Sequence, residues 1–221
     1  MKRILVFGDS NSWGYTDEDN GQRYEKRWPI LLSQELIQKG FNTEIIEDCL
    51  PGRTTNIDDP QDGIHLNGAK VLKSSLLSHS PIDLVILMLG TNDLKFRFQR
   101  TAENIADGIK ELIQIVLDTN SGSGGWHDVN KSNLVVICPP TLGQKSDDPN
   151  WINFKEWEGG LEKSTELHFS FEKVCSQMGV HLIDANEFCQ SSSIDPIHWS
   201  KKMHLKFSEN LANIIDQKIK L

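Results

Sequence analysis

Short apolar runs alternate with longer helical patterns along most of the chain, and this alternation restricts the fold more than any other feature. The runs are nearly continuous in Val, Ile and Leu, which is typical of strands covered on both faces of a sheet. Strand and helix in alternation predict a parallel sheet with helices on both sides and right-handed crossovers. The predicted strands are Arg3–Phe7, Thr43–Glu47, Leu84–Leu89, Leu134–Cys138 and Val180–Ile183, and the predicted helices are Trp28–Gln38, Leu66–His79, Ala102–Asp118, Glu158–Met178 and Leu205–Lys218.

The length of the chain favours one domain. Its 221 residues are enough for one sizeable core and few for two. No internal repeat occurs, and only the run SGSGG at Ser121–Gly125 has the composition of a flexible connection. We therefore predict a single α/β domain over residues 1–221. Ligands of open α/β sheets bind beyond the carboxyl ends of the strands, so function is expected in the loops that follow them.

Composition excludes several classes of partner. With 23 Lys and Arg against 31 Asp and Glu, the net charge of -8 lacks the basic footprint of a nucleic-acid binder. No run is long enough for a membrane span, and Ile4–Phe7 is too short for the core of an export signal. A cytoplasmic protein without membrane or nucleic-acid partners is expected. The cysteines lie far apart and are interpreted as free buried thiols: Cys49, Cys138, Cys175 and Cys189.

Polar segments accompany four of the predicted strands. GDS, ending at Ser10, follows the first strand, and CLPGRTTN, with Gly52, follows the second. GTND, with Asn92, follows the third strand. SIDPIHWS, with Asp195 and His198, lies between the fifth strand and the last helix. Because the strands are predicted to be parallel, these segments are expected to meet at one rim of the sheet.

These residue types are the ones that acyl transfer requires. A serine hydroxyl needs an adjacent base, for which neutral imidazole is suited, and a carboxylate orients that imidazole and stabilises its charged form. Asp195 can supply this carboxylate to His198 from one short turn. The backbone N–H groups of Ser10 and Gly52 and the side-chain amide of Asn92 could donate hydrogen bonds to the oxyanion of the tetrahedral intermediate.

Each of these residues also has an ordinary structural interpretation. Ser10 could cap a helical turn, Gly52 could serve only a positive φ, and Asn92 could be a turn residue. The polar rim could then belong to a flavodoxin-like binding module that catalyses nothing. A metal site formed by Asp195, His198 and His204 has unsuitable spacing, and no Gly-rich phosphate loop follows a strand. We predict neither a metal nor another cofactor in the reaction.

Taken together, the four segments resemble the SGNH (GDSL-type) hydrolase superfamily, whose name lists its Ser, Gly, Asn and His blocks. FGDSNSWG, LPGRTTN, LGTND and DPIH occur in the family's order across nearly the whole chain. GRTTNIDDP, LVILMLGTNDLK and the segment Glu158–Leu167 are most similar to the small bacterial arylesterase/acyltransferase group. The resemblance implies a three-layer α/β/α fold with a five-stranded parallel sheet of flavodoxin-like topology.

The resemblance also implies roles for individual residues. Ser10 would be the nucleophile, Asp195 and His198 would complete the triad, and Gly52 and Asn92 would join Ser10 as oxyanion donors. Further residues of the same loops are expected to contact the substrate: Asp9, Trp13, Thr91, Lys95 and Ile197. The family often has Leu after the nucleophile, and Asn11 in this chain predicts a more polar pocket wall.

The expected activity is that of an esterase or acyltransferase acting on short-chain or aryl esters, with water or an alcohol as acceptor. Carbohydrate O-acetylesterases and lysophospholipases or thioesterases of the same superfamily stay open, because a fold does not select a substrate. Aromatic residues in the loops predict either local packing or burial in a homo-oligomer, which the resemblance also implies: Trp13, Phe96, Phe98, Trp151, Phe154, Trp157 and Trp199. Arg53 and Lys95 flank the Gly and Asn blocks and could steer substrates or fix loops, although such charges usually face solvent. The remaining histidines are expected at the surface or behind the site residues, not in catalysis: His65, His79, His127, His168 and His181.

Overall fold

The computed structural model describes residues 1–219, and its centre is one five-stranded sheet. The strands lie in the order β2-β1-β3-β4-β5, and every neighbouring pair is parallel. This order is that of the flavodoxin-like doubly wound folds, so the predicted α/β class and topology are confirmed. The strands are β1 (Lys2–Gly8), β2 (Thr43–Cys49), β3 (Leu84–Met88), β4 (Asn133–Cys138) and β5 (His181–Asp184).

The five predicted helices are present, with shifted starts where the chain has a specific cap. The side chain of Asn67 accepts the N–H of Ala69, so that helix begins two residues later than predicted. The side chain of Ser200 accepts the N–H of Met203, so the last helix begins earlier than predicted. The α-helices are α1 (Ser10–Trp13), α2 (Trp28–Gln38), α3 (Gly68–His79), α4 (Ala102–Asp118), α5 (Phe154–Trp157), α6 (Gly160–Met178) and α7 (Lys201–Lys218).

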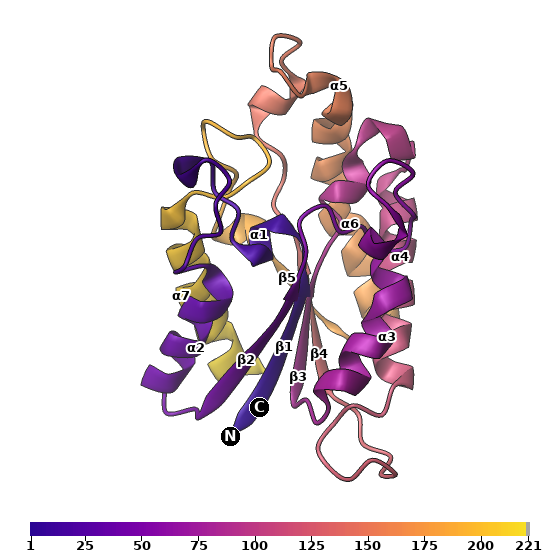
Figure 1. The fold of residues 1–221 in the computed structure, drawn as a ribbon, viewed down its shortest axis with the longest axis vertical. Coiled ribbons are helices and arrows are strands. Elements are labelled where there is room, and N and C mark those ends of the chain that lie inside the picture. The colour runs from indigo at the N-terminus through magenta and orange to yellow at the C-terminus, as the bar shows by residue number, and fades with distance from the viewer. Residues whose placement is uncertain (220–221) are drawn as a thin grey trace.

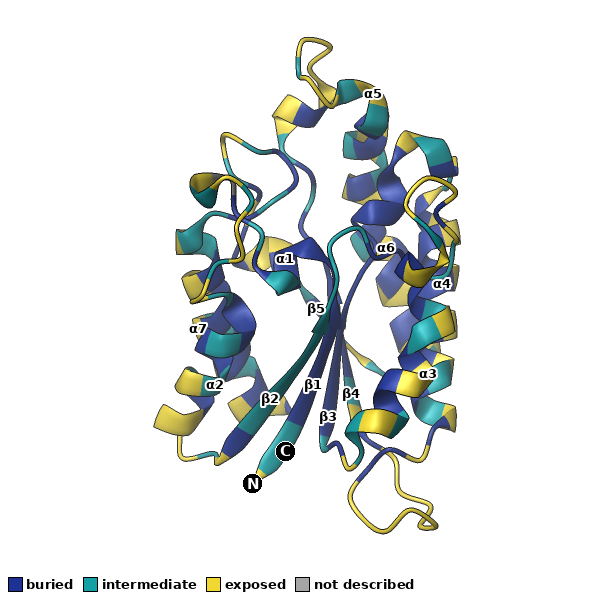
Figure 2. Cartoon of the chain, in the orientation of Figure 1, coloured by how far each residue is buried: buried dark blue, intermediate teal, exposed yellow. Residues whose placement is uncertain are grey.

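Helices cover both faces of the sheet, as Figure 1 shows: α2 and α7 lie on one side, and α3, α4 and α6 on the other. Alternate residues of β1 enter the two cores, because successive side chains of a strand point to opposite faces. Ile4 and Val6 pack in the core with Trp28 of α2, whereas Leu5 and Phe7 pack in the other core. The three central strands β1, β3 and β4 are mostly buried, whereas the edge strands β2 and β5 are mostly half-buried (Figure 2).

Two expectations about the whole chain can be compared with the described residues. Among residues 1–219, no helix combines the length and the apolar character that a membrane span needs. The four cysteines are unpaired. Three of them are buried, and Cys49 is only half-buried at the end of β2.

Helix α4 presses closely against the loop that follows β2. A Cβ atom on Gly108 would lie 2.1 Å from the hydroxyl oxygen of Thr55 and 2.7 Å from the side-chain oxygen of Asn56. Glycine is a poor helix residue, so its presence in the middle of α4 reflects this close approach. The contact packs the loop after β2, which carries Gly52, against α4.

We predict that Gly108→Ala destabilises the protein by about 1–3 kcal/mol, because the strain of the clash exceeds the gain in helix propensity. Urea denaturation followed by circular dichroism measures the change. Asp107→Ala, at the exposed neighbouring position of α4, is the control and should unfold at the same or slightly higher urea. Greater stability of Gly108→Ala would contradict the close packing of α4 on Thr55.

Candidate active site

The predicted site residues come together at the carboxyl ends of β1, β2 and β3. Ser10 begins α1 directly after β1, Gly52 follows β2, and Asn92 follows β3. The loop between β5 and α7 brings Asp195 and His198 to the same rim. Segments from the start, the middle and the end of the chain therefore form one site, as the parallel sheet predicts.

Ser10 is held at the tip of a tight strand-to-helix turn. The side chain of Asp9, not that of Ser10, caps α1 by accepting the N–H of Asn11 at 3.0 Å. Gly14 closes the short helix with φ of 96°, a left-handed conformation in which glycine carries no steric penalty. The hydroxyl of Ser10 is thus free of a capping role and points to the loop that carries His198.

Ser10, His198 and Asp195 form a continuous hydrogen-bonded line. The Oγ of Ser10 lies 3.0 Å from Nε2 of His198, across 188 positions of sequence. The Nδ1 of His198 lies 2.6 Å from Oδ2 of Asp195, and Oδ1 of Asp195 accepts the backbone N–H groups of Ile197 and His198. Because the ionised carboxylate only accepts, the imidazole proton is on Nδ1, and Nε2 is available to accept the proton of Ser10.

Asn11 anchors the histidine loop and does not form a pocket wall. Its Nδ2 donates to the carbonyl of Ile197 at 3.2 Å, and its Oδ1 accepts the N–H of Trp199 at 3.1 Å. These two bonds hold the backbone on both sides of His198. Asn11 is buried, so the prediction of a more polar pocket wall at this position is wrong, because the amide is used by the backbone of the loop.

Three hydrogen-bond donors face the space beside Ser10. Gly52 has φ of 87°, and its N–H, like that of Ser10, has no acceptor within the described part of the chain. The Nδ2 of Asn92 donates one proton to the carbonyl of Arg53 at 3.2 Å, which fixes the side chain and leaves its second proton available. These are the three donors that the sequence predicts, and together they suit an oxygen that becomes negative.

A buried ionic cluster holds the donor loops together. Asp93 is fully buried, accepts the N–H and the hydroxyl of Thr55 at 2.9 and 2.6 Å, and pairs with Arg100 at 2.7 Å. Arg53 is only 4% exposed, pairs with Asp48 at 2.7 Å and lies over an aromatic ring of β1. The expectation that Arg53 faces solvent is therefore wrong, since its guanidinium satisfies acceptors beneath the loop.

Burial has opposite outcomes for the two carboxylates of the site. Burial raises the pKa of Asp9 to about 6, because desolvation of the carboxylate outweighs the hydrogen bonds that it accepts and the attraction of His198. Burial also opposes ionisation of Asp195, but the hydrogen bond and positive charge of His198 outweigh it and lower the pKa of Asp195. Asp195 is therefore ionised at the pH at which neutral His198 could act as a base, whereas ionisation of Asp9 is unfavourable.

A cavity of about 250 Å³ opens in front of Ser10. Tyr15 forms one wall and packs on the His198 ring, with ring centroids 4.0 Å apart. Trp151 and Trp157 form another wall, from the segment that precedes α6. Sequence analysis named both tryptophans only as loop aromatics and did not assign Tyr15. An aromatic residue directly after the Gly14 turn is the one signal that could have pointed to it.

The predicted substrate contacts divide into two groups. Lys95 and Ile197 line the cavity, whereas Asp9, Trp13 and Thr91 lie outside its lining. Asp9 turns back to cap α1, and Thr91 is buried under the loop. The Nζ of Lys95 pairs with Glu156 at 3.0 Å and lies 5.5 Å from the ring of Trp157, so Lys95 does not face bulk solvent either.

His204 does not join Asp195 and His198 in a metal site. It is fully buried beside Trp199, and its Nδ1 accepts the N–H of Trp28 at 3.3 Å. Burial lowers the pKa of His204 to about 3, so it is a neutral core residue. Among residues 1–219, one group of side chains has donor atoms close enough to hold a cation, and it comes from β4, α6 and β5: Cys138, His168 and Asp184.

Comparison with known proteins identifies the family of this chain. Residues 6–206 match the GDSL-like lipase/acylhydrolase family. An arylesterase from Vibrio mimicus is 29% identical over 147 residues, which are 66% of this chain and 60% of that protein. The chain thus spans about three fifths of the length of this curated relative.

Solved structures match over almost the full length of both chains. An aryl esterase from M. smegmatis, in its inhibitor-bound form, superposes with a TM-score of 0.87 and 38% identity, covering 97% of this chain and 98% of that one. A carbohydrate acetylesterase from Sinorhizobium meliloti gives a TM-score of 0.86 and 35% identity over the same shares. These matches agree with the predicted family and fold. The chain belongs to the GDSL-like lipase/acylhydrolase family.

Proposed function

We propose that this protein cleaves small carboxylic esters through an acyl-enzyme on Ser10. The observation that carries the proposal is the line of hydrogen bonds from Ser10 through His198 to Asp195, 3.0 and 2.6 Å long. A helix cap or a passive binding loop would need no base aligned on the hydroxyl. The same line favours an enzyme over a flavodoxin-like binding module.

In the proposed mechanism, Nε2 of His198 takes the proton from Ser10 as Oγ attacks the ester carbonyl carbon. The tetrahedral intermediate places its negative oxygen among the N–H groups of Ser10 and Gly52 and the amide of Asn92. Its collapse breaks the bond to the alcohol oxygen, which receives the proton from His198. A water molecule or a second alcohol then gives a proton to His198 and attacks the acyl carbon. Collapse of this second intermediate breaks the bond to Oγ of Ser10, which takes the proton back from His198 and releases the acid or the new ester. Asp195 stabilises the charged imidazole in both halves.

The cavity supports a preference for small acyl or aryl esters. Its volume of about 250 Å³ is below the roughly 300–1,000 Å³ of pockets that enclose drug-sized ligands. Two tryptophans and Tyr15 offer flat apolar surface beside Ser10, which suits a short acyl chain or an aromatic alcohol. A long lipid chain has no comparable apolar channel in this lining.

A carbohydrate O-acetylesterase is the second candidate, because one side of the cavity is polar. Lys95, Asn153 and Glu156 line it together, and such groups can bind the hydroxyls of a sugar. The similarity to a carbohydrate acetylesterase supports the same candidate. Trp151 and Trp157, which come from the same segment as Asn153 and Glu156, support an aryl ester instead.

We further propose transfer of acyl groups to alcohols in a cytoplasmic homo-oligomer. Apolar side chains exposed near the rim support a subunit contact there: Ile64, Phe96, Ile152 and Ile194. Of the loop aromatics, Trp199, Trp157 and Phe98 are already buried within the chain, so a subunit contact is needed only for the others. A contact that narrows the cavity mouth would exclude water and favour an apolar alcohol as acceptor.

Ser10→Ala is predicted to lower kcat for p-nitrophenyl acetate by about 10³-fold or more, because the nucleophile and its base act as a unit. His198→Ala should be similarly severe. Ser12→Ala is the matched control: it lies in the same short helix, is fully buried, and has no hydrogen-bond partner among the described residues. Retention of most activity by Ser10→Ala, with unchanged circular dichroism, would refute the acyl-enzyme on Ser10.

Asp9→Asn is predicted to stabilise the protein at pH 8 but not at pH 4. The pKa of Asp9 in the folded state, about 6, exceeds its ordinary value of 3.8, so the ionised group destabilises the fold above pH 6 and the neutral group does not. A shift of about two pKa units corresponds to about 3 kcal/mol, or a rise in Tm of about 5–10 °C. Asparagine also keeps the cap on the N–H of Asn11. Thermal scans at both pH values measure the effect, and an unchanged Tm at pH 8 would contradict it.

A panel of esters is predicted to separate the two substrate classes. We expect kcat/KM to be highest for phenyl and p-nitrophenyl acetates and to fall steeply with longer acyl chains, because the cavity is small. Preference for acetylated xylose over phenyl acetate would instead favour the sugar esterase. Addition of benzyl alcohol in buffer measures transfer, as benzyl acetate formed relative to acetic acid.

A further inference from the structure

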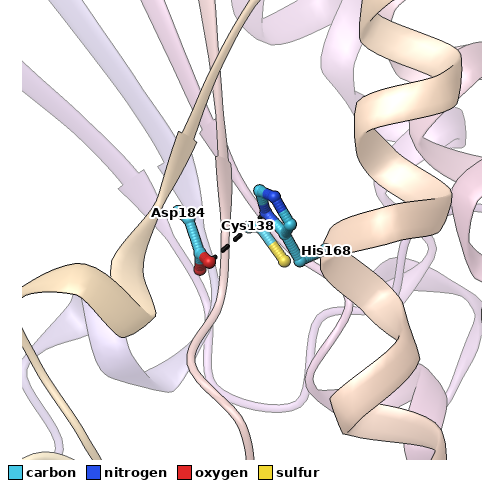
Figure 3. A group of neighbouring side chains, drawn as sticks. All are labelled: Cys138, His168 and Asp184. Atoms are coloured by element: carbon cyan, nitrogen blue, oxygen red, sulfur yellow. Dashed lines mark ion pairs between the residues drawn. The ribbon is translucent and has the colours of Figure 1, made fainter.

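We propose that Cys138, His168 and Asp184 form a binding site for a Zn²⁺-class cation that takes no part in the chemistry at Ser10. Figure 3 shows the three side chains pointing toward one another from β4, α6 and β5. One donor atom from each residue, a sulfur, a ring nitrogen and a carboxylate oxygen, lies within 4.8 Å of the other two. Sequence spacing could not reveal this group, because its members are 30 and 16 positions apart.

The pair of His168 and Asp184 has the separation of two ligands of one metal. Nδ1 of His168 lies 3.3 Å from Oδ2 of Asp184, yet this buried nitrogen atom makes no hydrogen bond of acceptable geometry within the described residues. Ligand atoms on one tetrahedral zinc are about 3–4 Å apart, given metal–ligand distances of about 2.0–2.3 Å. The thiol of Cys138 needs a shift of about 1 Å to complete such a set.

The surroundings of the carboxylate support a ligand role. Oδ1 of Asp184 accepts the backbone N–H and the side-chain amide of Asn186, at 3.0 and 2.8 Å. These bonds fix the carboxylate and leave Oδ2 directed at His168. Carboxylates that bind metals are commonly held in this way by a hydrogen bond to the other oxygen.

The donor set selects the class of cation. A thiolate and an imidazole favour Zn²⁺ and related transition metals, whereas Mg²⁺ and Ca²⁺ prefer oxygen ligands. The side chain of His168 is 42% exposed, so water can occupy a fourth position on that side. Binding to the sulfur displaces the thiol proton to solvent, which the cation must drive because burial raises the pKa of Cys138.

The same three residue types could also serve a cysteine nucleophile, but the burial of the sulfur argues against this. Cys138 is 0% exposed, so a substrate carbonyl cannot approach its Sγ, whereas a single ion can enter beside the exposed ring of His168. A bound ion would join β4 and β5 to α6. It would thereby tie both ends of segment 139–159, which carries Trp151 and Glu156 of the substrate cavity.

Titration of the metal-free, full-length protein with Zn²⁺, followed by calorimetry, tests the site, together with the absorption spectrum of the Co²⁺ complex. We expect one bound ion and a thiolate-to-Co²⁺ charge-transfer band, which the surface histidines cannot produce. Cys138→Ser should lose the band. Cys189→Ser, a buried thiol in the other core, should keep it.

His168→Ala is a second test that does not depend on a buried substitution, because this side chain is half-exposed. Its affinity for Zn²⁺ should fall at least about tenfold. Equal affinity of His168→Ala and the unmodified protein would overturn the proposal. A Co²⁺ complex without the charge-transfer band would overturn it as well, since it would place the ion on surface histidines.

Discussion

The hydrogen bond between Ser10 and His198 is the contact on which the site depends, and almost every feature of the rim serves its geometry. The two residues are 188 positions apart, so no local preference can bring them together. The flavodoxin-like strand order does so, because it places β1 between β2 and β3, with the donor loops of those two strands on either side. β1 and β3, which carry the Ser10 and Asn92 segments, are buried between the two helical layers.

Around that contact, the chain uses buried polar residues as braces. Asn11 holds the backbone on both sides of His198, and Asp93 ties the loop of Asn92 to the loop of Gly52 through Thr55. Buried polar groups of this kind stabilise a structure only when they are fully paired. Asp9 is only partly paired, because its Oδ2 has no hydrogen-bond partner among the described residues, and burial raises its pKa. Perturbed pKa values of this kind are common at functional sites.

Sequence reasoning reached the strands, the main helices and the residues around Ser10, because these depend on local patterns. Apolar runs reveal buried strands, and three of the four motifs follow a strand directly, whereas the resemblance to the SGNH superfamily implied the roles of their residues. It failed where the burial and contacts of a side chain depend on residues far away in the sequence. Arg53 looked like a surface charge but is buried under the loop, and Asn11 looked like a pocket residue but binds the backbone of another loop. The contributions of Tyr15 and Glu156 to the cavity, and the meeting of Cys138 with His168, were invisible for the same reason.

The central claim is that Ser10 is activated by His198 at this rim, and covalent trapping tests it most directly. A fluorophosphonate reacts with a serine only when a base and an oxyanion site assist the attack. After incubation with the probe, intact-mass spectrometry should show one adduct per chain, and peptide mapping should locate it on Ser10. His198→Ala should abolish labelling without loss of fold. An adduct on another residue, or none on the folded protein, would contradict the account.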